Sequence, residues 1–151
     1  MLTDSFPCIK TQRCELVEFS DSDCEDLYLL LQDRQIQRYL PGLLPFCKNQ
    51  DTALLMIGIF RMNFLEGKAI LWKINLNGHM VGFIGMADIP DMPYVFYAIS
   101  PTSRCQGYMK ECLKALKAQL MLHRYPMPAI EADPTNEPSL KIKDFWSEDY
   151  Q

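Results

Sequence analysis

Apolar and polar residues change their spacing several times along the chain, and each change predicts an element of secondary structure. Residues Cys8 to Phe19 alternate loosely between apolar and polar positions, which predicts a first strand. A helix is predicted next, since Ser20 with Asp23, or Ser22 with Glu25, forms a capping box at its start. Its apolar residues recur at i, i+3, i+4 and i+7, namely Cys24, Leu27, Tyr28 and Leu31.

Prolines and glycines separate this helix from a second one. Pro41-Gly42 and Pro45 indicate a loop, after which Asp51 to Leu65 has a helical pattern that stops at Gly67. The chain thus predicts two helices before the next strand.

A β-hairpin is predicted in the middle of the chain. Ile70–Leu76 and His79–Ile89 are both rich in strand-forming residues, and Asn77-Gly78 lies between them. Asn-Gly favours a type I′ turn, because that turn needs positive φ at both central residues. Tyr94–Ser100, which ends at Pro101, predicts a further strand.

The longest amphipathic pattern follows Gly107 and ends before Pro126. Its apolar stripe consists of Met109, Cys112, Leu113, Leu116 and Leu120, and the opposite, solvated side carries Lys110, Lys114 and Lys117. A helix is therefore expected directly after this glycine.

The last segment predicts a strand at Ala129–Ala132 and a turn leading to a short helix within 133–143. The order β-α-α-β-β-β-α-β-α lacks the alternating rhythm of a doubly wound fold. It predicts a three-layer α+β domain over residues 1–151, with a mixed sheet between helices.

The size and charge of the chain limit the classes of function that it can have. A chain of 151 residues with 48% hydrophobic residues is sufficient for one core. The net charge of −4 argues against general nucleic-acid binding, which needs a basic face. The N-terminus lacks a signal-peptide pattern, and the apolar run Ala53–Phe60 is shorter than the ~20 residues of a membrane span. We therefore expect a cytoplasmic protein without a membrane segment.

The thiols and imidazoles do not predict a metal site. The six cysteines form no CxxC pair, and His79 and His123 have no metal-ligand spacing. Free thiols in a reducing compartment are the expectation.

The segment from Tyr97 to Glu111 predicts an anion site, because it runs from a strand through a Gly-containing loop into a helix. A helix N-terminus exposes unpaired N–H groups and the positive end of a dipole. The loop lacks the GK[ST] of a P-loop and the three glycines of a Rossmann fingerprint. In the alternative interpretation, Gly107 only permits a tight turn.

The same loop resembles the acyl-CoA loop of the GNAT N-acetyltransferases, whose pattern is Arg or Gln, two variable residues, Gly, one variable residue, then Gly or Ala. Arg104 to Met109 is compatible with it at five of six positions. Further matches follow the family's order: Thr11, Arg13 and Leu16 as T-x-R-x-x-L, then Trp72, Val81–Gly85, Tyr97–Pro101, and Asn136 with Ser139. The branch that includes ribosomal-protein N-terminal acetyltransferases is the most similar.

This resemblance implies a mostly antiparallel sheet, acetyl-CoA as co-substrate, no metal, and an amine acceptor. It places the pantetheine arm along the strand that ends at Ile99 and the pyrophosphate on the loop amides. Arg104 and Lys110 are expected to add charge. The implied cofactor-binding residues are Ile99, Arg104, Cys105, Gln106, Gly107, Tyr108, Met109 and Asn136. Asn136 is equally well interpreted as a turn residue or cap.

The catalytic residues stay open. A free alkylamine has a pKa of ~10, so a base or a water wire has to assist its attack. In the related branch a carboxylate often lies three residues before the tyrosine that matches Tyr97, and here that residue is Tyr94. Candidates for a relayed base are Asp88, Asp91 and Glu131, and candidates to protonate the thiolate are Tyr94 and Tyr97.

Two departures from the family pattern give an alternative function. Met109 replaces a small residue, and it crowds the pyrophosphate unless its side chain turns into the core. The segment after Asn136 is short and lacks the family's final hairpin. The alternative is a catalytically impaired domain that binds CoA as a regulatory or interaction module. An uncovered sheet edge also predicts a homodimer.

Overall fold

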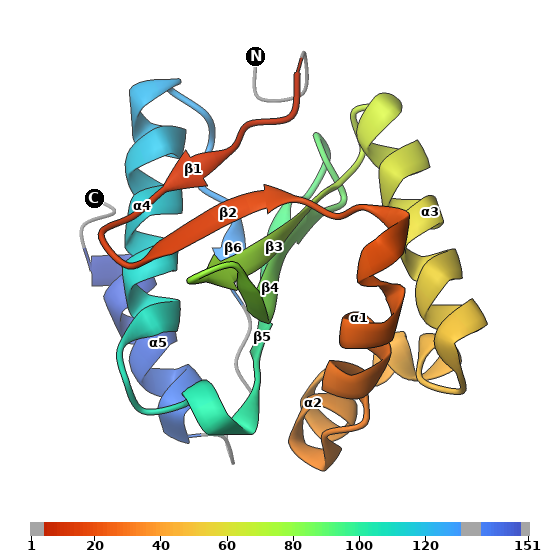
Figure 1. The fold of residues 1–151 in the computed structure, drawn as a ribbon. Coiled ribbons are helices and arrows are strands. Elements are labelled where there is room, and N and C mark those ends of the chain that lie inside the picture. Colours follow the sequence, from red (N-terminus) through yellow and green to blue (C-terminus); the bar gives the residue numbers. More distant parts are fainter. Residues whose placement is uncertain (1–4, 131–136, 149–151) are drawn as a thin grey trace.

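The structure, a computed structural model, describes residues 5–130 and 137–148 and has a six-stranded sheet between two groups of helices (Figure 1). The strands lie in the order of the sequence, and every neighbouring pair is antiparallel except β5 and β6, which are parallel. The strands are β1 (Ile9–Lys10), β2 (Cys14–Glu18), β3 (Ile70–Leu76), β4 (His79–Ala87), β5 (Tyr94–Ile99) and β6 (Ala129–Ile130). The helices are α1 (Cys24–Leu31), α2 (Arg34–Tyr39), α3 (Gln50–Leu65), α4 (Tyr108–Leu122) and α5 (Glu137–Glu148). This three-layer mixed arrangement confirms the predicted fold class.

The N-terminal segment is a hairpin, so the prediction of one strand over 8–19 was wrong. β1 pairs with β2 across a turn at residues 11–13. The Thr11 hydroxyl accepts the Cys14 N–H at 2.9 Å, and the Thr11 N–H donates to the Cys14 carbonyl at the same distance. Loose alternation did not reveal this turn, because it has neither glycine nor proline.

The central hairpin confirms the Asn-Gly prediction. β3 and β4 pair through Leu76 and His79, with Asn77 at φ 52° and Gly78 at φ 80° between them. β5 pairs antiparallel to β4 along its whole length. The middle of the sheet therefore follows the order predicted from the sequence.

Helices α1 and α3 cover one face of the sheet (Figure 1). Leu27 and Leu31 of α1 are fully buried there, as the helical spacing predicts, and the Ser20 N–H donates to the Asp23 carboxylate at 2.8 Å. Helix α2 was not predicted, because only one of its six residues, Ile36, is buried, which leaves no apolar periodicity to detect.

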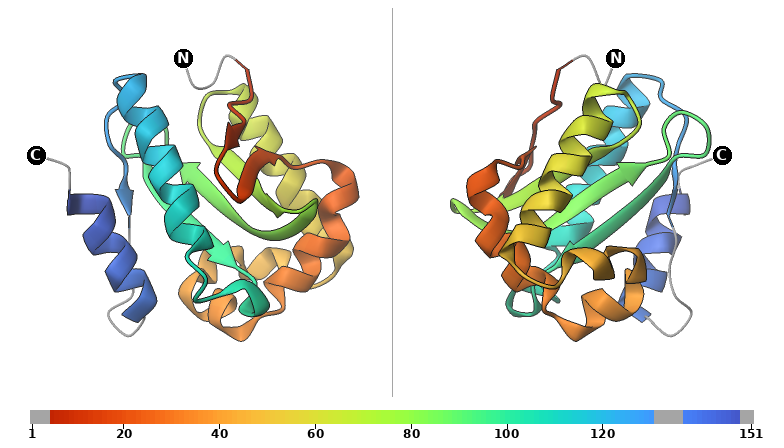
Figure 2. Two further views of the ribbon diagram at one scale, coloured as in Figure 1. Left: turned by 60° about the vertical axis from the view of Figure 1, so that its left-hand side comes forward. Right: turned by 90° about the vertical axis from the view of Figure 1, so that its right-hand side faces the viewer.

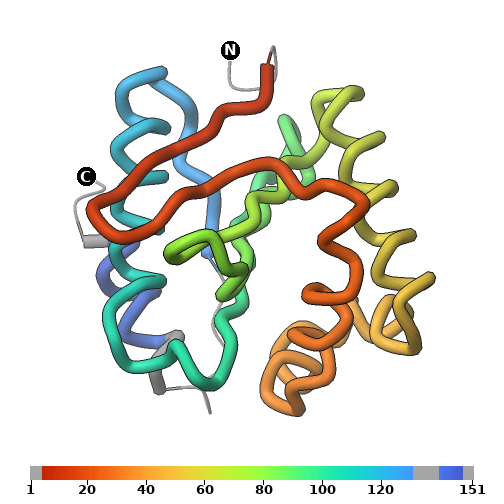
Figure 3. Tube along the Cα trace, in the orientation of Figure 1, coloured from red at the N-terminus to blue at the C-terminus, as the bar shows by residue number. Residues whose placement is uncertain are grey.

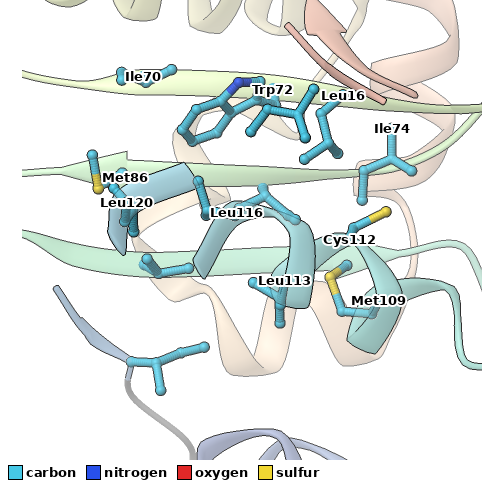
Figure 4. Close-up of a cluster of buried hydrophobic side chains, with 14 of the residues drawn as sticks. Leu16, Ile70, Trp72, Ile74, Met86, Met109, Cys112, Leu113, Leu116 and Leu120 are labelled. Atoms are coloured by element: carbon cyan, nitrogen blue, oxygen red, sulfur yellow. The ribbon is translucent and has the colours of Figure 1, made fainter. Parts of the chain in front are cut away.

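Helix α4 covers the opposite face, and its buried stripe packs against β2, β3 and β4 (Figure 4). Each fully buried leucine of such a stripe contributes roughly 2 kcal/mol through removal of apolar surface from water. The buried members are Met109, Cys112, Leu113, Leu116 and Leu120, the same five that the helical spacing predicts.

Helix α5 lies beside α4 near the β6 edge (Figure 2), and a buried lysine connects the two helices. The prediction of a solvated Lys117 was wrong, because its side chain is only 4% exposed and its Nζ donates to the Trp146 carbonyl at 2.8 Å. The Trp146 indole in turn donates to the Pro128 carbonyl at 2.9 Å. Lys114, one turn earlier, is exposed as predicted.

Within the ranges 5–130 and 137–148, no helix is both long enough and apolar enough to cross a membrane. All six cysteines are free, as expected from their spacing. Side chains of histidine, cysteine, aspartate and glutamate form no group of three or more that could hold a metal ion in this part of the chain.

The close approach of β4 and β5 depends on Gly82. A Cβ added there overlaps the Ala98 carbonyl oxygen and lies 3.0 Å from the Ile99 Cα. Both obstacles are backbone atoms, so the strands themselves would have to separate.

We predict that Gly82→Ala lowers the free energy of unfolding by about 1–3 kcal/mol, because overpacking forces the backbone to shift. Gly58→Ala is the control, since this glycine lies inside α3 with no atom within 4 Å of an added Cβ. The control is expected to stabilise the protein by about 0.5–1 kcal/mol. Urea denaturation of the two variants measures both effects, and equal changes would contradict the described strand spacing.

Candidate functional site

The loop between β5 and α4 has an unusual backbone. After Ile99 the chain makes a short 3-10 turn, Pro101–Ser103, and then reaches residues 104–107. Cys105 has φ 62° and Gly107 φ 81°, both in the left-handed region. Gly107 is the N-cap of α4, so the strand leads directly into the first turn of that helix.

The first turn of α4 is open at its N-terminus. No side chain in the described part of the chain caps it, and the Glu111 N–H is the one that bonds to the Gly107 carbonyl, at 3.0 Å. The N–H groups of Tyr108, Met109 and Lys110 precede the first intrahelical bond. They point out of the positive end of the helix dipole, which favours an anion.

β5 is paired on only part of one side. It meets β6 at Tyr94 and Val95, whereas residues 96–99 have only β4 as a strand partner among the described residues. This part of β5 ends beside the loop that begins α4 (Figure 1). An extended ligand could therefore follow the strand edge to the helix N-terminus.

The turn between β1 and β2 reaches across to the start of α4 (Figure 3). The Glu111 carboxylate accepts hydrogen bonds from the Thr11 hydroxyl, from the Arg13 N–H at 2.8 Å and from Arg13 Nε at 2.7 Å. Arg13 Nη1 also donates to the Gln106 carbonyl at 3.1 Å. Burial raises the pKa of Glu111, but these bonds outweigh it and hold the pKa below its ordinary value.

A second arginine connects the same loop to α2. Arg104 Nη2 donates to Asp33 Oδ2 at 2.6 Å. The same oxygen caps the N-terminus of α2, because it accepts the Ile36 N–H at 3.1 Å. Arg104 therefore has a protein partner in this structure. The phosphate contact expected for it stays a prediction.

Comparison with known families identifies the domain. The sequence-family model of the acetyltransferase (GNAT) domain matches residues 13–143 of this chain. The chain belongs to the GNAT acetyltransferase family. No curated protein sequence matches it closely enough to be counted as a relative.

Solved structures show the same GNAT fold. RimL, a ribosomal L7/L12 α-N-protein acetyltransferase in complex with coenzyme A, has a TM-score of 0.79 and 19% identity over 90% of this chain and 80% of that one. The Salmonella typhimurium enzyme that modifies the N-terminal serine of L7/L12 has a TM-score of 0.77 and 18% identity over 90% and 81%. The microcin C7 self-immunity acetyltransferase MccE, in complex with acetyl-CoA and AMP, has 0.73 and 16% over 89% and 77%.

The GNAT loop motif accommodates its methionine. Met109 is 6% exposed and packs with the α4 core stripe (Figure 4), so its bulk lies away from the open first turn. A substitution is tolerated less well at Gly107. An added Cβ would lie 3.4 Å from Arg13 Nη2, and the positive φ of this residue disfavours any side chain. Cys105 and Gln106 are exposed, and Tyr108 is half-buried.

The two tyrosine candidates lie on opposite faces of the GNAT sheet. Tyr97 packs with the α4 core, and its hydroxyl is buried. Tyr94 is 41% exposed, with its ring 6.2 Å from that of Phe96, which packs on the α1 and α3 side. The two tyrosines therefore cannot both donate a proton to the same thiolate. The exposed Asp88 and Asp91 lie in the β4–β5 connection, and Glu131 and Asn136 lie outside the described residues.

Sequence reasoning did not assign a role to Glu111. Two features of the sequence could have pointed to it: Glu111 is an acidic residue in the first turn of a predicted helix, and T-x-R-x-x-L contains an arginine that could pair with it. The two residues are 98 positions apart, so the helical pattern gave no reason to pair them.

We predict that the stabilising effect of Glu111 disappears in acid. Its pKa is lowered in the folded state, so its contribution is complete above the unfolded value of ~4.3 and is lost as the pH falls through the folded value. The difference in unfolding free energy between wild type and Glu111→Gln is expected to be constant above about pH 5.5 and to shrink below it. Urea denaturation between pH 3 and 7, a range set about the ordinary pKa of ~4.3, measures this.

Glu66→Gln is the matched control, because Glu66 pairs with Lys68 at 3.0 Å on the surface and is 52% exposed. An exposed pair of this kind contributes little. The same pH dependence in both variants would contradict the assignment to the Glu111 cluster.

Proposed function

We propose that this chain is an acetyl-CoA-dependent N-acetyltransferase that moves an acetyl group to a primary amine by direct attack. The observation that carries the proposal is the uncapped first turn of α4, which lies beside the part of β5 without a described partner strand on one side. Family membership supports acetyl transfer, and two structures with the same fold hold coenzyme A or acetyl-CoA.

The residues of the loop fit a diphosphate. Gly107 leaves the entrance free of a side chain, and the buried Met109 does not obstruct it. The N–H groups of residues 105–110 are the proposed donors, and the exposed Lys110 adds positive charge. Ile99 ends the strand along which the pantetheine arm is proposed to lie, and Asn136 is proposed to approach that arm.

Positioning accounts for much of the proposed catalysis. When bound, acetyl-CoA supplies an activated acetyl thioester. The backbone of β5 orients it, and an N–H of the strand is suited to stabilise negative charge on the carbonyl oxygen. The acceptor amine has to lose a proton, since its pKa of ~10 keeps it charged near neutral pH.

Proton transfer is assigned to a small set of candidates. Tyr97 is proposed to donate its hydroxyl proton to the leaving thiolate, since it lies on β5 two residues before the strand ends. Tyr94 is the other candidate for this proton donor, and Asp88, Asp91 and Glu131 remain candidates for the relayed base. The acceptor is a small molecule or a protein N-terminus, the second being the acceptor of the RimL-type structures.

A specific observation favours a second candidate function, a CoA-binding regulatory or interaction module without catalysis. Tyr94 occupies the position where the related branch often has a carboxylate, and it is exposed on the face opposite Tyr97. A homodimer and a cytoplasmic location also remain predictions.

We predict that Gly107→Glu weakens acetyl-CoA binding by about tenfold or more, because it places charge and bulk at the helix N-terminus. Isothermal titration of the purified protein measures the affinity. Gly42→Glu is the matched control, since nothing lies within 4 Å of its added Cβ and it lies before α3, in a 3-10 helix (Pro41–Phe46) where the sequence predicted a loop. Unchanged affinity in Gly107→Glu would contradict the proposed loop.

Thiol release in the same samples, with a panel of primary amines and N-terminal peptides, separates the two functions. Turnover with an amine is expected of the enzyme. Binding without turnover across the panel would favour the regulatory module, and wild-type protein that does not bind acetyl-CoA would overturn both.

A further inference from the structure

Arg13 lies over the proposed diphosphate loop and is held there by three contacts. Its Nη1 donates to the Gln106 carbonyl at 3.1 Å, and its Nε donates to Glu111 Oε1 at 2.7 Å. The guanidinium carbon is 4.4 Å from the centre of the Tyr108 ring. The three contacts come from the loop and the first turn of α4, so one side chain fixes both relative to the β1–β2 turn.

Stability alone does not account for this arrangement. The Arg13 side chain is 42% exposed, and ion pairs with such exposure typically contribute little to stability. The contacts instead define an orientation, because a guanidinium donates in fixed directions from a planar fork. Stacking on Tyr108 further restricts the plane of that fork.

The orientation matters at the peptide bond between Gln106 and Gly107. A trans peptide directs its carbonyl oxygen and its N–H to opposite sides. Since Arg13 holds the Gln106 carbonyl, the Gly107 N–H points away from Arg13. A carbonyl oxygen turned toward a phosphate repels it, whereas an N–H attracts it.

Glu111 creates a second requirement for a cation. Its carboxylate lies in the first turn of α4, where negative charge stabilises the helix but repels a bound phosphate. Arg13 donates to this carboxylate through both its backbone N–H and its Nε. The same residue therefore neutralises the acid and turns the carbonyl.

We infer that Arg13 is a positioning residue for the diphosphate of acetyl-CoA: it holds the Gln106 carbonyl back so that the Gly107 N–H faces the ligand, and it neutralises Glu111. This inference rests on the proposed function. It gives the arginine of T-x-R-x-x-L a role that the loop motif does not include.

The test compares Arg13→Met with Arg61→Met. Arg61 is the matched control because it also forms one surface ion pair, with Asp21 at 2.8 Å, and is 40% exposed. Acetyl-CoA is titrated by calorimetry, and S-acetylpantetheine, which lacks the diphosphate, is titrated by NMR. Arg13→Met is expected to bind acetyl-CoA about tenfold more weakly than wild type, with unchanged affinity for S-acetylpantetheine. Arg61→Met is expected to bind both ligands as wild type does.

A direct readout of orientation comes from the amide resonances of the unliganded protein. The Gly107 resonance is expected to shift in Arg13→Met and not in Arg61→Met. Wild-type affinity for acetyl-CoA in a folded Arg13→Met variant would overturn the inference, and so would an equal loss for both ligands. Wild-type protein that fails to bind acetyl-CoA would instead overturn the proposed function, and this inference with it.

Two further variants protect the test against a folding defect. Arg13→Met combined with Glu111→Gln removes the unpaired carboxylate but also lacks the carbonyl contact, so it is expected to fold and still bind acetyl-CoA weakly. Glu111→Gln alone keeps that contact and loses the negative charge, so it is expected to bind at least as tightly as wild type. Wild-type affinity in the double variant would overturn the role in carbonyl orientation, whereas weak binding by Glu111→Gln would overturn the role in neutralisation.

Discussion

The packing of α4 against the sheet determines where the rest of the candidate site lies. The five apolar side chains of its stripe, from Met109 to Leu120, are buried, and a rotation about the helix axis would expose them to water. Burial of each large side chain contributes roughly 1.5–3 kcal/mol, so the helix has one stable orientation. Its first turn is consequently fixed beside the end of β5, with the uncapped N–H groups directed away from the core. The same orientation buries Lys117, which connects α4 to α5.

Two long-range ion pairs then fix the conformation of the loop that precedes α4. Arg13 bonds to Glu111 across 98 residues, and Arg104 bonds to Asp33 across 71. These pairs fasten the β1–β2 turn and α2 to one short segment on opposite sides of its glycine. Neither pair is deeply buried, so each contributes more to geometry than to stability. The backbone that would meet a diphosphate is thus shaped by side chains from outside the family's loop motif.

The accuracy of the sequence predictions follows from how local the interactions are. The β3–β4 hairpin was predictable because Asn77 and Gly78 alone supply the positive φ angles of the turn. The first strand was predicted as one piece, since the turn at Thr11 is formed by hydrogen bonds of ordinary residues. Helix α2 has one buried residue and no periodicity, and Lys117 looked solvated because α5 lies beyond the range of helical spacing.

By itself the sequence determined the order of the central elements, the glycine at the start of α4 and the family resemblance of Arg104 to Met109, because these depend on backbone conformation and on residues close in sequence. Tertiary structure alone decided that the first segment turns back at Thr11, that Lys117 is buried against α5, and that Arg13 reaches Glu111. Those outcomes depend on which face of each element is buried and on which distant segments meet. Both are set by the simultaneous packing of α4 and the strands rather than by any local pattern.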